Sequence, residues 1–455
     1  MAETKFSSIE GKSPGYRWLL LALALLALAG LASFVASYIQ GHELLGSSNA
    51  VPWGMPIVFL IYLIGLSAGS LILSSLTYVF GREEYKPIAR LAVYLAIVLI
   101  FGAMVFIFVD LGRPEKFWRL FMFFYLNNMK SMFAINGVLY GGYFLISLSY
   151  LGFIFFDRPR MTRAVGTLAV GWAMLVHMGT GAIFGFVAAR ETWFSAVRPL
   201  EFLTAALTSG MALLIVAVVV TMHFTRRMVR RETIVSLGRM LSAFIIVLLV
   251  LVFLDKLTHL YPPHREAAQY MLAGQFSGIF WIFQIGMGAV IPLIILFHPT
   301  WRQSVRWVTL AGLSVVIGVF FERYYLVIPG AAYPLKLAAG EIEGIWGATI
   351  SFPITPVETL LSLGIIAILG LLFLFGLKYL ELLPVTRKPA PAAAPAAPEE
   401  AKPAEAPPAA EAAAEEKAPE TPPAETAALE EKPAEAAPDA EKTESDEPGN
   451  TDDKG

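Results

Sequence analysis

Long apolar stretches separated by short polar turns occupy the chain from residue 17 to residue 383. The stretches lack the alternation of a membrane strand, and each is close to the roughly 20 residues that a helix needs to cross a bilayer. In lipid, a helix satisfies its own backbone hydrogen bonds. The pattern predicts an all-α, polytopic membrane protein with ten spans at residues 17–39, 53–80, 88–111, 131–156, 163–188, 200–224, 237–259, 276–297, 304–327 and 356–380.

The turns on the side of the N-terminus carry nearly twice as many Lys and Arg residues as the turns on the other side. Loops rich in Lys and Arg stay in the cytoplasm. We therefore expect a multi-pass protein of the cytoplasmic (inner) membrane, with both termini in the cytoplasm. The longer aromatic loops, at residues 112–130, 261–275 and 329–355, would lie on the outer side.

Residues 389–455 differ from the rest of the chain, since they are mostly Ala, Pro, Glu and Lys with almost no aliphatic bulk. Such a segment cannot bury enough apolar surface to offset the entropy of ordering. We predict a disordered cytoplasmic tail, more plausibly a solvated tether than a docking motif.

The 455 residues include no cysteine, and the formal net charge is −2. The charge gives no reason to expect nucleic acid. Without cysteine the protein cannot ligate an iron–sulfur cluster through Cys or attach a c-type haem. If electrons pass through this protein, their carrier is a non-covalent cofactor or a partner subunit.

The acids of the predicted spans lie near the outer ends of the helices, and an ionisable residue inside a membrane indicates a functional site by default. Asp110 ends the third span in the motif Asp110-Leu111-Gly112-Arg113-Pro114. The Gly and Pro explain why the helix stops, and Arg113 can neutralise the acid. They do not explain a carboxylate at a helix C-terminus, where the dipole opposes it. We therefore interpret Asp110 as functional.

His177 lies in the outer half of the fifth span. A neutral histidine bonded to a neighbouring helix accounts for it. The alternatives are a hydrogen-bond donor to a quinone and a haem ligand. A bis-histidine haem needs two histidines at one depth, and only His259 approaches the level of His177, so we expect neither haem nor another metal site.

Two pairs of adjacent charges, Asp255-Lys256 and Glu322-Arg323, lie in the seventh and ninth spans, and Glu358 begins the tenth. Neighbours on a helix do not face each other, so each charge needs another partner. Cross-helix ion pairs among these three spans account for the pattern, and so does a proton relay through Asp255, Glu322, Arg323 and Glu358.

Several motifs together resemble the NrfD family of quinone-interacting membrane subunits in polysulfide reductase-like complexes. Trp53-Gly54 opens the second span, residues 65–70 (GLSAGS) give it a small-residue face, and residues 85–87 (YKP) and the Asp110 motif follow. Close helix packing explains the small-residue face better than a quinone path does. Residues 322–329 (ERYYLVIP) are similar to a late helix of the longer HybB and DsrP types.

The resemblance implies two four-helix bundles plus two extra helices. The chain would then consist of four parts. They are an N-terminal segment with the first span at residues 1–52, an eight-helix core at 53–327, an outer loop with the last span at 328–388, and the tail at 389–455. It implies a menaquinone or ubiquinone site near the outer face of the first bundle. Asp110 matches the family's quinone-site acid, and His177 matches only by helix position.

We expect the headgroup near Asp110, His177 and Arg113, with Trp53 and Tyr140 beside the ring. The resemblance also implies a ferredoxin-like iron–sulfur subunit and a catalytic or cytochrome subunit as partners, docked on the outer loops. The favoured function is electron exchange between quinol and that partner, with the redox chemistry belonging to the quinone. The alternative is a secondary transporter, although its paired broken helices are not evident in the sequence.

Overall fold

The computed structural model describes residues 5–48, 51–119, 122, 131–261, 265–333 and 353–385. Ten helical spans in this part are long and apolar enough to cross a membrane, which confirms the predicted all-α, polytopic membrane protein. The predicted tail, residues 389–455, lies outside the described residues.

The spans follow one another along the chain. They are α1 (Pro14–Gln40), α2 (Met55–Tyr78), α3 (Lys86–Asp110), α5 (Met132–Phe155), α6 (Pro159–Gly185), α7 (Arg198–Thr225), α8 (Arg231–His259), the π-helix η5 (Ile279–Val290) continued by α10 (Ile291–Phe297), α11 (Val305–Ala332) and α12 (Pro356–Tyr379). The short helices are η1 (His42–Leu45), η2 (Glu83–Tyr85), η3 (Pro114–Lys116), α9 (Arg265–Ala273) and η6 (Trp301–Gln303).

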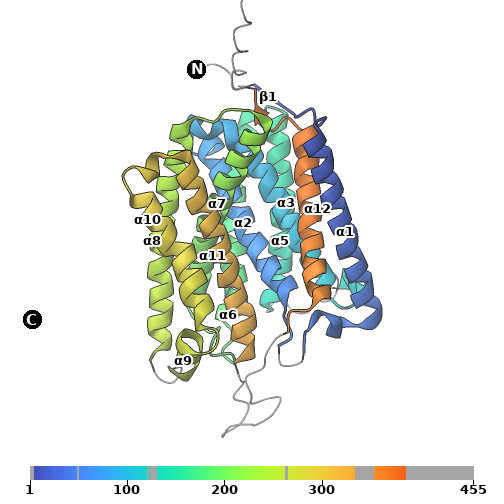
Figure 1. Ribbon diagram of the computed structural model, residues 1–455, viewed down its shortest axis with the longest axis vertical. Helices are drawn as coiled ribbons and strands as arrows, with labels where there is room; N and C mark the ends of the chain where they lie inside the picture. Colours follow the sequence, from blue (N-terminus) through green and yellow to red (C-terminus); the bar gives the residue numbers. More distant parts are fainter. Residues whose placement is uncertain are drawn as a thin grey trace, which may run out of the picture. The chain divides into compact units, whose positions relative to one another are not determined.

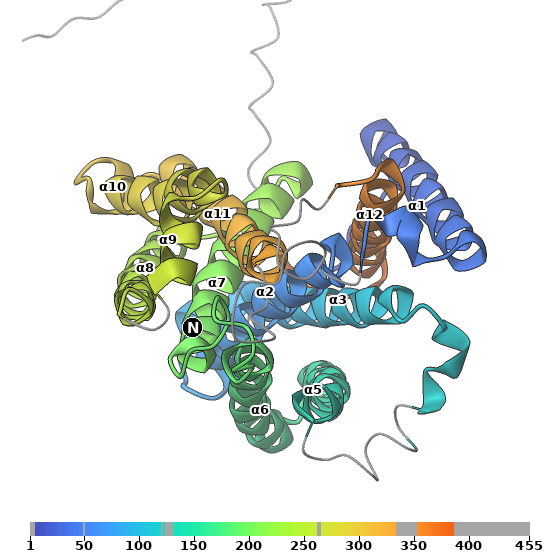
Figure 2. The same ribbon diagram turned by 90° about the horizontal axis from the view of Figure 1, so that it is seen from below.

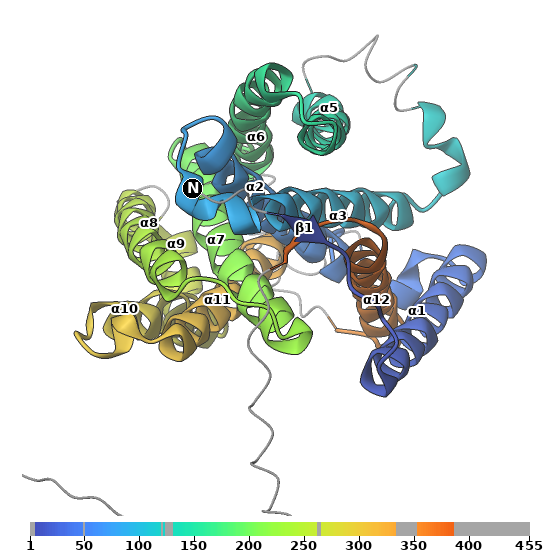
Figure 3. The same cartoon turned by 90° about the horizontal axis from the view of Figure 1, so that it is seen from above.

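The spans form two groups of four with a pair of helices beside them. Helices α2, α3, α5 and α6 pack as a first bundle, and α7, α8, η5–α10 and α11 pack as a second. Helices α2 and α7 join the two bundles (Figure 2). Helix α12 packs on α3, and α1 packs on α12 (Figure 3). This is the predicted arrangement of two bundles plus two extra helices.

Helices α2 and α7 approach each other closely through glycine. A Cβ atom on Gly69 would lie 2.6 Å from the Cα of Gly210, which leaves no space for a side chain. Small residues permit such contact in lipid, where packing replaces the hydrophobic effect between helices. The small-residue face of residues 65–70 is therefore a packing surface, as predicted.

The two ends of the described chain meet at the upper end of the bundle in Figure 1. Strand β1 (Phe6–Ser7) pairs antiparallel with β2 (Leu383–Pro384). Arg227, between α7 and α8, donates hydrogen bonds to the carbonyls of Leu383 at 2.9 Å and Pro384 at 2.8 Å. Both ends therefore lie on one side of the membrane, as an even number of crossings requires.

Helix boundaries differ from the predicted ones where polar residues continue a helix. Helix α8 begins at Arg231 and not at residue 237, and α11 continues through Pro329 to Ala332. The α6–α7 loop supports this last turn, because Thr192 Oγ1 donates to the carbonyl of Gly330 at 2.8 Å and Trp193 Nε1 to that of Leu326 at 2.7 Å. Both donors bind carbonyls of the last two turns of α11, and they fasten the helix end that contains Pro329 to this loop.

Candidate functional site

A cavity of about 360 Å³ lies within the first bundle, between α2, α3, α5 and α6. Aliphatic and aromatic side chains form most of its wall. Its few polar groups include Asp110, Asn136, Tyr140 and the indole of Trp53. An apolar pocket of this size with a few polar groups is typical of a small-molecule site. The structure thus brings three of the predicted quinone-site residues, Asp110, Trp53 and Tyr140, onto one cavity.

Asp110 is the last residue of α3, and its half-buried side chain lines the cavity. Within the described part of the chain, its carboxylate has no hydrogen bond or ion pair. The carboxylate of Glu358 interacts with it electrostatically. An unpaired acid facing an apolar cavity is costly unless it serves a ligand or a proton.

Arg113 does not have the place that the sequence predicted. Its side chain is exposed, it is not part of the cavity wall, and among the described residues it forms no ion pair with Asp110. The turn explains the difference, because Gly112 adopts a φ of +62° directly after the helix. This left-handed C-cap ends α3 and redirects the chain before Arg113.

Helix α5 gives the cavity its space and an amide that the sequence analysis missed. Ala134, Gly137 and Gly141 are small residues on its wall. Asn136 donates from Nδ2 to the carbonyl of Met132 at 2.8 Å, and its Oδ1 has no hydrogen-bond partner among the described residues. An asparagine within an apolar span was the available signal.

The hydrogen bond between Tyr140 and Thr180 can have only one direction. It lies 2.9 Å from Thr180 Oγ1, and Thr180 donates its own proton to the carbonyl of Val176 at 2.7 Å. Since a threonine hydroxyl has one proton, Tyr140 donates to Thr180. The oxygen of Tyr140 is left as a hydrogen-bond acceptor at the cavity.

Trp53 belongs to an aromatic cluster at the wall of the cavity. Its ring stacks on Trp193 with 5.3 Å between centroids and 11° between planes. Phe133 and Phe184 meet Trp53 edge-on at 5.5 and 5.7 Å. Such packing fixes the indole and presents a rigid aromatic wall to a ligand.

His177, on α6, is buried within the first bundle but does not line the cavity. Its Nδ1 lies 2.7 Å from the carbonyl of Ala173, and its Nε2 lies 3.0 Å from that of Ile64. The second contact joins α6 to α2. The structure thus brings His177 to the backbone of a cavity helix and not to the cavity itself.

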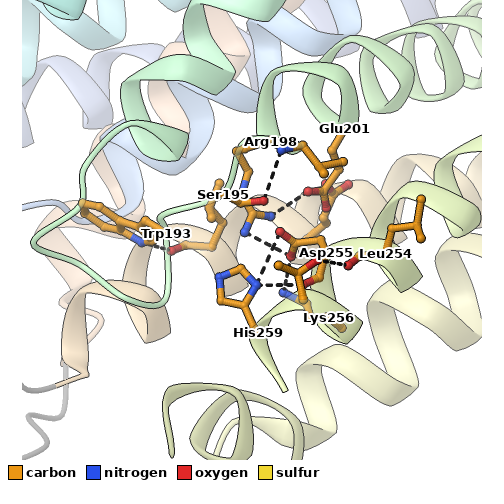
Figure 4. Close-up of polar contacts among 12 residues, drawn as sticks. Trp193, Ser195, Arg198, Glu201, Leu254, Asp255, Lys256 and His259 are labelled. Atoms are coloured by element: carbon orange, nitrogen blue, oxygen red, sulfur yellow. Dashed lines mark hydrogen bonds and ion pairs between the residues drawn. The ribbon is translucent and has the colours of Figure 1, made fainter. Parts of the chain in front are cut away.

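A second polar cluster lies within the second bundle, between α7 and α8 (Figure 4). Arg198 donates from Nη1 to Glu201 Oε2 at 2.7 Å and from Nη2 to Asp255 Oδ2 at 3.1 Å. Lys256 Nζ lies 3.0 Å from the same oxygen of Asp255, and His259 Nδ1 lies 2.7 Å from the backbone carbonyl of Asp255. The expectation that adjacent charges do not meet is therefore wrong for Asp255 and Lys256. The long lysine side chain reaches back to a carboxylate that already faces α7.

Glu322 and Arg323 complete this cluster from α11. They also contact each other, at 3.3 Å between Glu322 Oε1 and Arg323 Nη1. The guanidinium of Arg323 lies 4.0 Å from the ring centroid of Phe202. Arg198 was not among the predicted site residues, although its spacing from Glu201, three residues on, was a readable signal.

Glu358, which the sequence grouped with Asp255 and Glu322, lies elsewhere. Its Oε1 accepts a hydrogen bond from the backbone N–H of Met55 at 2.6 Å, at the start of α2. The predicted ion pairing among the seventh, ninth and tenth spans is therefore wrong for the tenth. The cross-helix partner of Asp255 is Arg198 on α7, and Glu358 belongs to the region around Asp110.

Comparison with known proteins gives a consistent picture. The sequence profile of the family described as polysulphide reductase, NrfD, matches residues 43–334. The Hdr-like menaquinol oxidoreductase integral membrane subunit of Archaeoglobus fulgidus is 37% identical over 387 residues, which cover 84% of this chain and 97% of the relative. The selenate reductase C subunit of Mesobacillus selenatarsenatis is 30% identical, covering 80% and 93%. The menaquinone reductase integral membrane subunit of Nitratidesulfovibrio vulgaris is 22% identical, covering 65% and 77%.

Proposed function

Because this chain belongs to the polysulphide reductase NrfD family, we propose that it is the membrane subunit of a respiratory oxidoreductase complex. In this proposal it exchanges electrons between menaquinol or menaquinone and an iron–sulfur partner subunit, which serves a catalytic or cytochrome subunit. The names of the relatives, a menaquinol oxidoreductase subunit and two reductase subunits, support this class. We place the protein in the cytoplasmic membrane with both termini in the cytoplasm.

The observation that carries the proposal is the cavity of the first bundle with the carboxylate of Asp110 on its wall, which has no partner among the described residues. When bound, the quinol supplies two electrons and two protons. The apolar wall holds the ring, and Trp53 provides an aromatic face for it. The oxygen of Tyr140 accepts a hydrogen bond from a quinol hydroxyl, Asn136 can donate or accept one, and Asp110 takes up a proton.

The transporter alternative has less support. Secondary transporters place their substrates between helices that break near the midplane. In the part of the chain that the structure describes, the spans are continuous, and the π-helix η5 runs directly into α10. The charged groups around Asp110 and Asp255 lie near helix ends and not at the middle of the spans, which supports the quinone function over transport.

The test is the Asp110→Asn variant in the complete complex, assayed with a water-soluble naphthoquinol. Asparagine keeps the shape of the side chain and removes its titration, so we expect normal assembly and a turnover lower by about a hundredfold. The control is Glu115→Gln, an exposed acid of η3 that is not on the cavity wall. Parental turnover of the Asn variant at every pH would refute the role of Asp110.

A further inference from the structure

A second carboxylate, that of Glu358, lies in the first turn of α12, next to the start of α2. This start of α12 is its lower end in Figure 1. The Met55 N–H donates to it at 2.6 Å. Thr355, the N-cap of α12, donates to the carbonyl of Leu44 at 2.7 Å and fastens the same end to η1. These two contacts hold the first turn of α12, which contains Glu358, against α2 and η1.

Glu358 is fully buried, with 0% of its surface exposed. Its Oε2 makes no hydrogen bond among the described residues, and its carboxylate interacts electrostatically with that of Asp110. A charge on either carboxylate disfavours a charge on the other, because their repulsion adds to the cost of burial. When Glu358 holds a proton, Asp110 can therefore be the anion that accepts one from a ligand.

Helix capping is the simpler explanation of Glu358, and it is incomplete. Thr355 and Glu358 have the spacing of a capping box, and Thr355 Oγ1 accepts the N–H of Glu358 at 3.1 Å. The cap explains an acid in the first turn of α12. It does not explain why this acid points to another helix and is buried beside a second acid.

We propose that Glu358 is the second proton-holding carboxylate of the quinol site. Each quinol that is oxidised releases two protons with its two electrons. Glu358 holds a proton at rest and leaves Asp110 anionic. Asp110 takes the first proton from a quinol hydroxyl. Glu358 then releases its own proton to the outer side and receives the one from Asp110, which returns Asp110 to the anionic form for the second proton. In quinone reduction the same protons move in the opposite direction. This inference rests on the proposed function.

Other titratable groups surround the pair. Tyr324 of α11 interacts electrostatically with Glu358. The ring of His42, from η1, lies 3.6 Å from the position that a Cβ atom on Gly112 would take. Burial lowers the pKa of His42, so this ring is neutral near pH 7 and can accept a proton on the outer side. Glu43 of the same helix is exposed and serves as a control.

The experiment compares Glu358→Gln with Met55→Pro in the complete complex. Glutamine keeps an oxygen for the Met55 N–H but cannot take up a proton. Proline removes that N–H at a helix position that favours proline, and it leaves the carboxylate in place. We expect Glu358→Gln to lower kcat for naphthoquinol about tenfold or more, with little change in KM, and to reduce two ionisations in the pH profile to one. Met55→Pro should keep both ionisations, because the carboxylate remains, and Glu43→Gln should keep the parental pH profile.

If Glu358→Gln keeps the parental kcat and pH profile while Met55→Pro loses turnover, Glu358 only anchors α2. If Asp110→Asn loses turnover and Glu358→Gln does not, this inference fails while the proposed function stands. A parent complex that neither oxidises naphthoquinol nor reduces naphthoquinone would overturn both. If Glu358→Gln does not assemble, infrared difference spectra test whether both carboxyl groups change protonation. The inference is supported if two carboxyl bands change in the parent and one changes in Asp110→Asn. A single changing band in the parent overturns it.

Discussion

Arg198 on α7 lies 3.1 Å from Asp255 on α8, and this buried contact joins two helices of the second bundle (Figure 4). Around it the cluster has as many acids as bases, with Glu201, Asp255 and Glu322 facing Arg198, Lys256 and Arg323. A balanced set of buried charges is stable only while every member is present.

We expect Asp255→Asn to destabilise the protein by about 3–5 kcal/mol, because it leaves Arg198 and Lys256 without their shared carboxylate. Chemical or thermal unfolding in detergent measures this. The matched control is Glu83→Gln, which breaks the exposed 3.5 Å pair with Lys86 and should cost less than about 1 kcal/mol. An equal effect of both variants would contradict a structural role for the cluster. Quinol turnover of the folded Asp255 variant then tests the predicted relay through Glu322 and Arg323.

The pairing of β1 with β2 makes a second prediction, about topology. The chain has no cysteine, so single cysteines can be introduced without background. Lys5→Cys and Val385→Cys should react with a membrane-impermeant maleimide from the same side, and Ser48→Cys from the opposite side. Inverted and right-side-out vesicles provide the two orientations. Reaction of all three from one side would contradict ten crossings.

The spans could be predicted from the sequence because length and apolar continuity are properties of a single segment. The acid of the cavity could be predicted for a similar reason, since Asp110 stands out against its own helix. The contacts of Arg113 could not, because they depend on the direction in which the chain leaves Gly112 at a φ of +62°.

The partner of Glu358 was not readable from the sequence either. Met55 is 303 residues away along the chain, and its N–H carries no signal in the residue types. The same holds for His177, because the sequence does not show whether a polar residue within a span faces a cavity or a backbone carbonyl, here that of Ile64. The register between helices decides such cases, and packing of the whole bundle sets that register.

A third prediction concerns haem. Both ring nitrogens of His177 lie against backbone carbonyls, and Nδ1 of His259 lies 2.7 Å from the carbonyl of Asp255. An axial ligand needs a ring nitrogen directed at the iron. We therefore expect the purified protein to show no b-type band in a reduced-minus-oxidised spectrum after washing. A stoichiometric b-type spectrum that disappears in His177→Ala would contradict this.

The last prediction concerns the space in the cavity. Gly141 lines it, and a Cβ atom on Gly141 would meet nothing within 4 Å. A leucine at this position can therefore fill the cavity without displacing a helix. Gly152 on the same helix also has open space around its Cβ position, but it is not on the cavity wall.

We expect Gly141→Leu to raise KM for naphthoquinol at least about tenfold, while Gly152→Leu stays within about twofold of the parent. The leucine side chain fills space that the ligand would occupy, so the ligand loses apolar contacts with the cavity wall. Burial of an apolar group of this size contributes about 1.5–3 kcal/mol. Both variants should unfold at the same denaturant concentration, because both replace a glycine of α5 that has free space around it. If Gly141→Leu oxidises naphthoquinol with the parental KM, the quinol binds outside this cavity, and the roles assigned to Asp110, Asn136 and Tyr140 fail together.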